Sequence, residues 1–355
     1  MFKKSSIFFG CLIGVCFIAG HIGSAQKAPR QYIANKTSEP IAIDGNDNEN
    51  SWKNASWSEQ FIDIEGKIQP KYPTRMKMLW DADYLYFFAQ MTEPHVWASL
   101  KQRDTVIFYN NDFEIFIDPD GDTHNYYEFE MNAFNTVWDL FLTKPYRNQG
   151  KVIDSWDIQG LKSAVSVAGT INDSSDKDTG WNVEIAIPWA VITEAGSSKL
   201  PPVNQFWRIN FSRVNWDFDL VDGRYMRKKG ADGKFLREYN WVWSPQWVIN
   251  MHEPEHWGYV FFSDDSADKK VFAIPRDEEI KWYMYRYYRK LLKAKENIEE
   301  AVGELLNASK EIDGSPIALR FEKRLSGWTL WSESPFSGDI LMIAEDGEFT
   351  IEKRE

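Results

Sequence analysis

Three glutamates on two neighbouring predicted strands have chemistry suited to a sugar ligand. Glu114 lies in the first strand, and Glu128 and Glu130 lie in the second. Side chains alternate between the faces of a strand, so Glu128, Glu130 and Asn132 should share one face. Carboxylates can form the acid–base pair of a glycosidase, or they can accept hydrogen bonds from ligand hydroxyls. A strand face that is merely exposed to solvent has the same alternation of polar and apolar residues. We expect these four residues to form a polar ledge on the open face of a sheet.

A turn with three aspartates follows the first of these strands. Asp118, Asp120 and Asp122 surround Pro119 and Gly121. Calcium takes about six to eight oxygen ligands, which such a turn can supply, although the spacing differs from that of an EF-hand. Proline, glycine and aspartate are equally typical of an ordinary hairpin turn. A structural calcium site and a plain turn both remain open.

The segment from His252 to His256 has the letters of the zinc-protease motif His-Glu-x-x-His. That motif works when both histidines lie on one face of a helix and bind the same ion. Pro254 disfavours a helix here, because proline has no amide hydrogen and clashes with the preceding turn. We interpret the segment as a loop in which His252 hydrogen-bonds a ligand.

Tryptophan is unusually frequent, with 17 residues in the chain. Indole rings suit a sandwich core, and they also stack on the apolar face of a sugar. Most should be core residues. Trp97, Trp138 and Trp247 lie beside prolines, polar residues or loop signals, and are the candidates for exposed rings.

Short alternating runs separated by turn signals indicate a mainly β domain over residues 26–265. Many short strands with almost no helical periodicity favour an antiparallel β-sandwich. Two hairpins are expected. Their strands are 75–79 with 84–91, and 113–117 with 126–131, and further strands are expected at 136–142, 161–169, 181–187, 206–214 and 258–262.

The pattern changes in residues 272–355. Apolar side chains recur every three or four residues from Ile280 to Leu305, which predicts one long helix. Residues 318–352 are typical of a small β-meander. The apolar stripe of the helix could pair with a second copy of the chain, or could pack on its own sandwich or tail.

Residues 1–25 have the pattern of a secretory signal peptide. Lys3 and Lys4 precede an apolar stretch, and Gly23-Ser24-Ala25 resembles a cleavage site. The apolar stretch is shorter than the ~20 residues that span a bilayer. We expect a periplasmic, cell-surface or secreted protein with no integral membrane segment after cleavage.

Charge and cysteine content disfavour some classes of partner and of site. The chain has 41 basic and 53 acidic side chains and a net charge of -12, which disfavours nucleic acid as a partner. Both cysteines, Cys11 and Cys16, lie in the predicted signal peptide. The mature chain would therefore have no disulfide and no thiolate metal site.

Five motifs follow one another along the chain. They are Ile41-Ala42-Ile43-Asp44-Gly45 with Trp52, Trp80-Asp81-Ala82-Asp83-Tyr84-Leu85-Tyr86, Asp112-Phe113-Glu114-Ile115-Phe116-Ile117-Asp118, Gly180-Trp181-Asn182-Val183-Glu184-Ile185-Ala186-Ile187-Pro188-Trp189, and Trp257-Gly258. Family 9 carbohydrate-binding modules, a branch of the DOMON-like sandwiches, have these motifs in the same order, and the chain resembles this family over residues 38–262. The resemblance implies a β-sandwich, a structural calcium ion and a sugar end held between two aromatic rings.

The resemblance also implies particular contacts. Glu93, Glu114 and Asn210 match polar positions of the family, and Glu130 stands where its pattern has a basic residue. The ring positions fall at Phe108 or Tyr109 and in the loop 247–252. With the ledge and loop candidates, the expected carbohydrate-binding residues are Glu93, Phe108, Tyr109, Glu114, Glu130, Asn132, Trp138, Asn210, Trp247 and His252. Related sandwiches bind haem, for which Met131 or Met251 with His252 would be the candidates.

The leading hypothesis is an exported carbohydrate-binding protein that acts in polysaccharide degradation without catalysis. A glycoside hydrolase using two of Glu114, Glu128 and Glu130 is the first alternative, and a structural module of the cell envelope is the second. Apart from a structural calcium ion, no cofactor is expected. Self-association would use the helix at 280–305.

Overall fold

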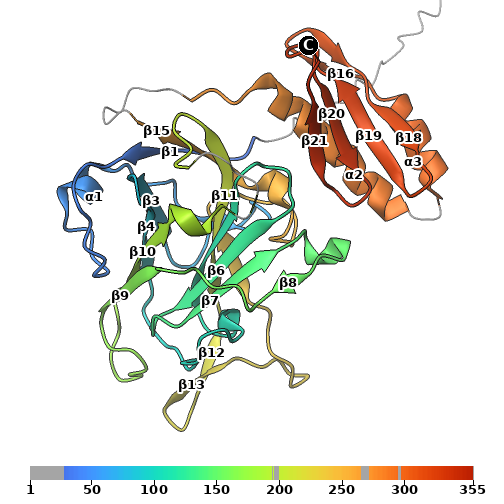
Figure 1. Ribbon diagram of the computed structural model, residues 1–355. Coiled ribbons are helices and arrows are strands. Elements are labelled where there is room, and N and C mark those ends of the chain that lie inside the picture. The colour runs from blue at the N-terminus through green and yellow to red at the C-terminus, as the bar shows by residue number, and fades with distance from the viewer. Residues whose placement is uncertain (1–27, 194, 196–199, 265–271, 295–296, 355) are drawn as a thin grey trace, which may run out of the picture.

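The computed structural model describes residues 28–193, 195, 200–264, 272–294 and 297–354. One large curled β-sheet is followed by a smaller C-terminal unit of helices and short strands (Figure 1). The predicted signal peptide lies outside the described residues. Among the helices that the structure describes, none has the length and apolarity needed to cross a membrane.

The large sheet contains thirteen strands within the described residues. They are β1 (Gln31–Lys36), β2 (Ile62–Asp63), β3 (Thr74–Trp80), β4 (Tyr84–Thr92), β5 (Asp112–Asp118), β6 (Tyr126–Asn132), β7 (Val137–Leu142), β8 (Val152–Ile153), β9 (Lys162–Ala168), β10 (Gly180–Pro188), β11 (Phe206–Asn215), β14 (Tyr239–Val242) and β15 (Gly258–Ser263). Their order is β8-β7-β6-β5-β11-β15-β1-β3-β4-β10-β9, and β14 and β2 extend from β11.

The curl turns this sheet into a sandwich. Phe129 and Met131 of β6 share one buried core with Phe87 of β4 and Val183 of β10. The predicted sandwich is confirmed, as are both predicted hairpins, β3–β4 and β5–β6. Most neighbouring strands are antiparallel, but β1 runs parallel to both β15 and β3.

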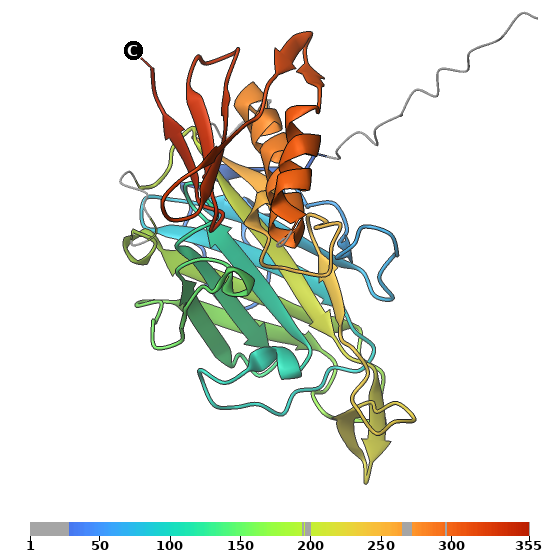
Figure 2. The ribbon, with the colours of Figure 1, turned by 90° about the vertical axis from the view of Figure 1, so that its right-hand side faces the viewer.

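Shorter elements lie around the sandwich. They are helix α1 (Asn50–Asn54), the single-turn helices η1 (Ile107–Tyr109), η2 (Tyr146–Asn148), η3 (Trp189–Val191) and η4 (Pro254–His256), and the hairpin of β12 (Phe218–Val221) and β13 (Arg224–Arg227). This hairpin projects from the end of the sandwich that lies away from the C-terminal unit (Figures 1 and 2).

The C-terminal unit packs two helices on a small sheet. Its elements are α2 (Arg276–Ala294), α3 (Ile298–Leu306), the pair β16 (Lys310–Ile312) and β17 (Ser315–Ile317), and the antiparallel sheet of β18 (Arg320–Lys323), β19 (Trp328–Glu333), β20 (Ile340–Ala344) and β21 (Phe349–Glu352). Ile280, Met284 and Leu305 share a core with this sheet. The apolar stripe of α2 is therefore buried within the chain.

The prediction of one helix from Ile280 to Leu305 is wrong. The chain folds back after α2, which brings Glu304 of α3 within 3.5 Å of Lys290 of α2. A straight helix rises about 1.5 Å per residue and would separate these two side chains by about 20 Å. Folding back lets both helices cover the same small sheet, which one straight helix could not do.

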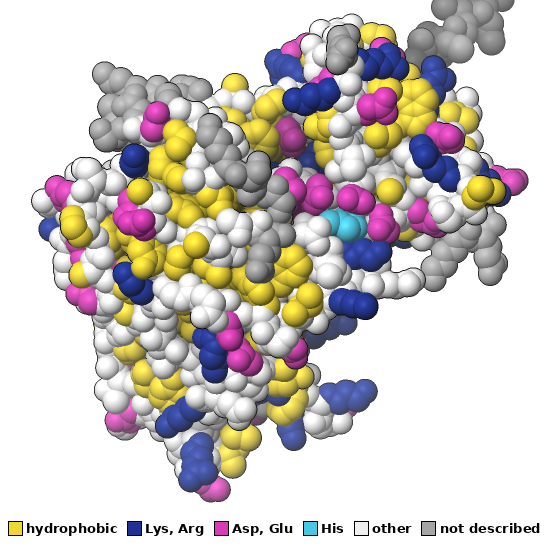
Figure 3. Space-filling model, viewed as in Figure 1, with side chains coloured by type: hydrophobic (Ala, Val, Ile, Leu, Met, Phe, Trp, Pro, Cys, Tyr) yellow, Lys and Arg dark blue, Asp and Glu magenta, His cyan; other side chains and the backbone are white. Residues whose placement is uncertain are grey.

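Helix α2 also joins the C-terminal unit to the sandwich. Tyr259 of β15 donates a hydrogen bond to Glu278 (2.6 Å) and accepts one from Trp282 (2.8 Å). Figure 2 shows the helices and the small sheet above one end of the sandwich. Acidic side chains gather at this junction on the face shown in Figure 3. The two parts are thus held together by buried polar contacts.

Candidate functional site

A pocket of about 360 Å³ lies over the outer face of the β5–β6–β7 layer. Alternation explains its floor, because Phe129 and Met131 point into the core and Glu128 and Glu130 point the other way. The volume lies within the range of small-ligand sites, about 300–1,000 Å³. The lining residues come from the strands, from η1, η2 and from the segments before β3 and around β14; they are Ile64, Phe108, Glu114, Phe116, Glu128, Glu130, Trp138, Leu140, Tyr146, Arg147, Val152, Val214, Glu238, Asn240, Ile249, Asn250, Met251 and His252.

Carboxyl groups dominate the pocket floor. Glu114 lies directly opposite Glu130 in the β5–β6 register, and Glu128 lies two residues earlier on the same face. All three are buried. Burial raises the pKa of Glu114 to about 7, and burial and neighbouring carboxylates hold the pKa of Glu128 and Glu130 well above the usual range. Near neutral pH the floor can therefore both donate and accept hydrogen bonds.

Aromatic side chains stand around this floor. Trp138 lies opposite Glu130, and its buried Nε1 has no hydrogen-bond partner among the described residues. The ring of Tyr146 lies 4.4 Å from that of His252 and is 45% exposed. The backbone N–H of Phe108 donates to Glu130 at 2.9 Å, which ties η1 to the floor. The pocket thus combines acceptors, a free indole donor and ring surfaces.

Comparison with known proteins identifies the sandwich. Residues 43–227, about half of the chain, match the family described as "Carbohydrate family 9 binding domain-like". The chain belongs to this family. The expected resemblance to family 9 modules is therefore confirmed.

Two curated enzymes match part of this chain. The chain is 29% identical over 117 residues to the exoglucanase XynX of Acetivibrio thermocellus, and 28% identical over 122 residues to the endo-1,4-beta-xylanase A of Thermoanaerobacterium saccharolyticum. These matches cover 33% and 34% of this chain, and 9% of each enzyme. The chain therefore spans only about a tenth of the length of these relatives.

One solved structure shares the fold of this chain, and a second is reported with it for comparison. A putative carbohydrate-binding protein from Bacteroides uniformis aligns over all of its length and 66% of this chain, with a TM-score of 0.50 and 15% identity. A family 9 module from Caldicellulosiruptor kristjanssonii in complex with cellotriose aligns over all of its length and 69% of this chain, with a TM-score of 0.42 and 16% identity.

Five of the residues expected for a family 9 site line the pocket. They are Phe108, Glu114, Glu130, Trp138 and His252. Tyr109 lies next to the pocket, with its ring 5.0 Å from that of Phe108, and is 46% exposed. The ledge pattern and one of the two expected ring positions therefore converge on one place.

Three of the expected polar residues lie elsewhere and bind the protein itself. Glu93 accepts hydrogen bonds from Arg213 (2.8 Å) and Asn215 (2.7 Å). Asn210 exchanges two hydrogen bonds with the backbone of Ser244. Asn132 accepts backbone N–H groups in its own turn and donates to the carbonyl of Leu100 at 2.8 Å. None of the three lines the pocket.

The expectation that Trp247 lines the same concave face is not met. Its backbone is left-handed, with φ of 60°, and its ring packs edge-on against His256 at 5.5 Å. Tyr146, together with Arg147 of η2, lines the pocket instead. No motif pointed to these two residues, which follow Pro145 in an irregular segment.

The aspartate turn between β5 and β6 carries a lysine beside it. Asp118 is buried, and its carboxylate accepts the N–H groups of Gly121 (2.8 Å) and Thr123 (2.9 Å). Lys281 of α2, 2% exposed, donates a hydrogen bond to the carbonyl of Gly121. Its ammonium supplies positive charge where a calcium ion would. Calcium at this turn stays a prediction, and the residues fit the ion poorly.

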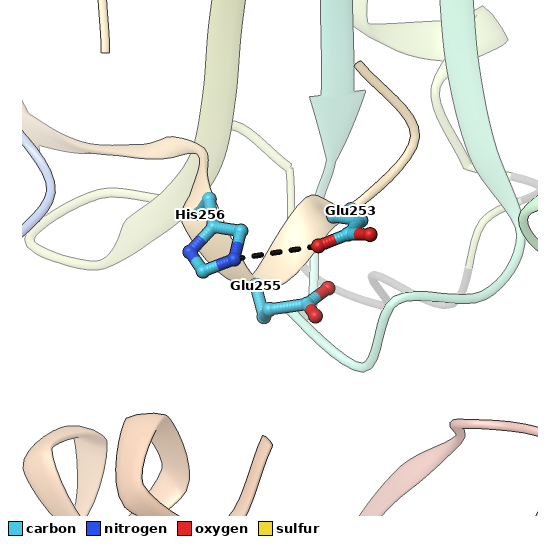
Figure 4. A group of neighbouring side chains, drawn as sticks. All are labelled: Glu253, Glu255 and His256. Carbon is cyan, nitrogen blue, oxygen red and sulfur yellow. Dashed lines mark ion pairs between the residues drawn. The ribbon is translucent and has the colours of Figure 1, made fainter. Parts of the chain in front are cut away.

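The His-Glu-x-x-His segment does not form one helix. Figure 4 shows its second half, where His256 lies 3.5 Å from Glu253 and Glu255 lies beside them. Arg289 of α2 binds both carboxylate oxygens of Glu255, at 2.6 and 2.9 Å. His252 lies before η4 and bonds to Tyr126 at 2.7 Å, in the pocket wall. The two histidines therefore make different contacts, which agrees with the interpretation of the segment as a loop.

Proposed function

We propose that this chain is an exported saccharide-binding protein that acts in polysaccharide degradation without catalysis, and that it holds its ligand in the pocket over β5 and β6. One observation carries the proposal. In a chain of family 9, Glu114, Glu128 and Glu130 face a pocket beside the unpartnered indole N–H of Trp138.

The pocket chemistry supports a polyhydroxylated ligand. Sugar hydroxyls can donate to the ionised carboxylates and accept from protonated ones, and the N–H of Trp138 can donate to a ring or hydroxyl oxygen. The rings of Trp138, Tyr146 and Phe108 offer flat apolar surface to the C–H face of the sugar. A few directed polar groups among apolar ones are typical of small-ligand sites.

The relatives and the N-terminal sequence support the wider setting. The two curated relatives are named as an exoglucanase and an endo-1,4-beta-xylanase, and this chain corresponds to a small part of each. A match to about a tenth of each enzyme supports a part in polysaccharide degradation that does not require the whole enzyme. The signal-peptide pattern of residues 1–25 supports export.

The test is a titration of the mature protein with mono- and oligosaccharides derived from cellulose and xylan. Calorimetry and tryptophan fluorescence should both show saturable binding. Glu128→Gln should weaken binding at least tenfold, while Glu352→Gln at the exposed end of strand β21 should not change it. The absence of a saturable response to every saccharide would overturn the proposal. Release of reducing ends by the wild type, lost in Glu128→Gln, would favour the hydrolase alternative.

A further inference from the structure

Within the described residues, acidic side chains, in one case together with a histidine, form four groups in which three ligand atoms lie close enough to share an ion. Three of these groups already contain a basic side chain. Lys281 lies at the first, Arg289 at the second and Arg103 at the third. The groups are, in that order, Asp118 with Asp120 and Asp122, Glu253 with Glu255 and His256, and Asp104 with Asp139 and Asp157.

The fourth group is Asp112, Glu114 and Glu130, at the floor of the pocket. It is the most buried of the four, with exposed fractions of 0%, 6% and 2%. No Lys or Arg side chain within the described part of the chain forms an ion pair or hydrogen bond with any of its members. Ionised carboxylates directly opposite each other on neighbouring strands repel, so Glu114 and Glu130 would both be ionised most readily beside a positive charge. Of the four groups, this is the one without a Lys or Arg partner among the described residues.

A second observation points to the same place. Asp112 is fully buried, and while its Oδ1 accepts the N–H of Val214 at 3.2 Å, its Oδ2 has no hydrogen-bond partner among the described residues. Leaving a buried polar atom unpaired costs about 1–3 kcal/mol, and more for a charged group. A ligand atom of Asp112 lies within 4.8 Å of those of Glu114 and Glu130. The carboxylate with the unpaired oxygen therefore belongs to the group that has no basic side chain as a partner.

We propose that a hard divalent cation, Ca²⁺ in the first place, binds between Asp112, Glu114 and Glu130 at the pocket floor. Carboxylate oxygens are the ligands that Ca²⁺ prefers, at about 2.3–2.6 Å, so two oxygens on one ion can lie up to about 5 Å apart. Ser212, fully buried and opposite Glu114 on β11, adds a hydroxyl oxygen on the same face. These groups leave part of the usual coordination shell of the ion unfilled.

The ion would face the ligand. Glu114 and Glu130 line the pocket, and Asp112 lies behind them outside its lining. The open coordination positions therefore point into the pocket, where water or the hydroxyls of a saccharide can fill them. This second step rests on the proposed function and makes saccharide affinity depend on the cation.

Ion binding can be measured without any saccharide. Protein stripped with EDTA is titrated with Ca²⁺ by calorimetry, and with Tb³⁺ by its luminescence sensitised by nearby tryptophan. We expect saturable binding that Asp112→Asn weakens at least tenfold and Asp118→Asn leaves unchanged. Trp138→Phe should reduce the Tb³⁺ signal while Ca²⁺ still binds. If Asp112→Asn fails to give a native circular dichroism spectrum, Glu130→Gln replaces it.

Two results would overturn the ion site. One is no heat and no luminescence change at millimolar Ca²⁺ or Tb³⁺; the other is binding that is lost in Asp118→Asn and retained in Asp112→Asn. Saccharide titrations with EDTA and with Ca²⁺ then test the coupling. At least tenfold weaker binding in EDTA, restored by Ca²⁺, is expected, and equal affinity in both would overturn the coupling. A protein that binds Ca²⁺ but no saccharide would refute the proposed function alone.

Discussion

The Nδ1 atom of His252 lies 2.7 Å from the hydroxyl oxygen of Tyr126. This contact joins the segment after β14 to strand β6 and closes one wall of the pocket. The carboxyl of Glu128, the phenol of Tyr146 and the guanidinium of Arg147 also face the imidazole. Burial, and then the charge of Arg147, lower the pKa of His252 to about 3. The ring is therefore neutral in the folded protein at physiological pH.

Replacing His252 should remove one source of acid sensitivity. The imidazole of an unfolded chain takes up a proton below about pH 6.5, whereas that of the folded chain does so only near pH 3. The unfolded state thus binds more protons between these values, and stability is lost as the pH falls. Each pKa unit is worth about 1.4 kcal/mol, so the unfolding free energy of the wild type should fall by roughly 3 kcal/mol more than that of His252→Gln between pH 7 and pH 4. Urea denaturation at several pH values measures this, and a difference that does not change with pH would contradict it.

Trp138 should carry more of the saccharide affinity than Trp247. Trp138→Ala removes a ring and an N–H from the pocket, and truncation of a central aromatic contact typically costs about 2 kcal/mol, or roughly 30-fold in affinity. Trp247→Ala serves as the matched control because Trp247 packs on His256 outside the pocket. Calorimetry on both variants, with circular dichroism to verify folding, decides the matter. Loss in Trp247→Ala with retention in Trp138→Ala would place the ring contact in the loop 247–252.

Lys281→Met should destabilise the protein by about 1–3 kcal/mol. The substitution removes a buried, charged hydrogen bond to Gly121 and leaves the aspartate turn without its ammonium group. Lys290→Met is the control, because the side chain of Lys290 is 46% exposed. Chemical denaturation of the two variants gives the comparison. Equal stability of wild type and Lys281→Met would show that the ammonium contributes nothing.

The same variant tests whether the lysine stands in for calcium. In an Asp112→Asn background, which removes the proposed ion site of the pocket floor, added Ca²⁺ should restore part of the stability that Lys281→Met loses. Added Ca²⁺ should not stabilise the Asp112→Asn variant that retains Lys281. If Ca²⁺ stabilised the variants with and without Lys281 equally, the turn would bind calcium beside the lysine.

Local patterns predicted the parts of the site that alternation controls. The period of two placed Glu128 and Glu130 opposite to Phe129 and Met131, and the structure has this arrangement. Glu93 is expected at the site only from the family resemblance. Its carboxylate instead binds Arg213, which is 120 residues away in sequence, and no local pattern indicates this pair.

Irregular backbone accounts for most of the remaining differences. Trp247 packs its ring on His256 outside the pocket lining, and its backbone adopts a left-handed conformation, which no strand or helix pattern predicts. Tyr146 and Arg147 reach the pocket because η2 follows β7 and folds over its outer face. The apolar stripe predicted helix correctly, but its period contains no information on where the chain reverses after Ala294.

The contacts of α2 change how this chain can be used as a recombinant module. Glu255, 2% exposed, depends on Arg289 for both of its carboxylate hydrogen bonds, and Arg208 lies 3.5 Å from Glu278. Cutting the chain after the sandwich would leave these charges without partners, which typically costs about 3–5 kcal/mol for a buried pair. A fusion protein that contained only the residues matched by the family would therefore be less stable. The unit to transfer extends through β21.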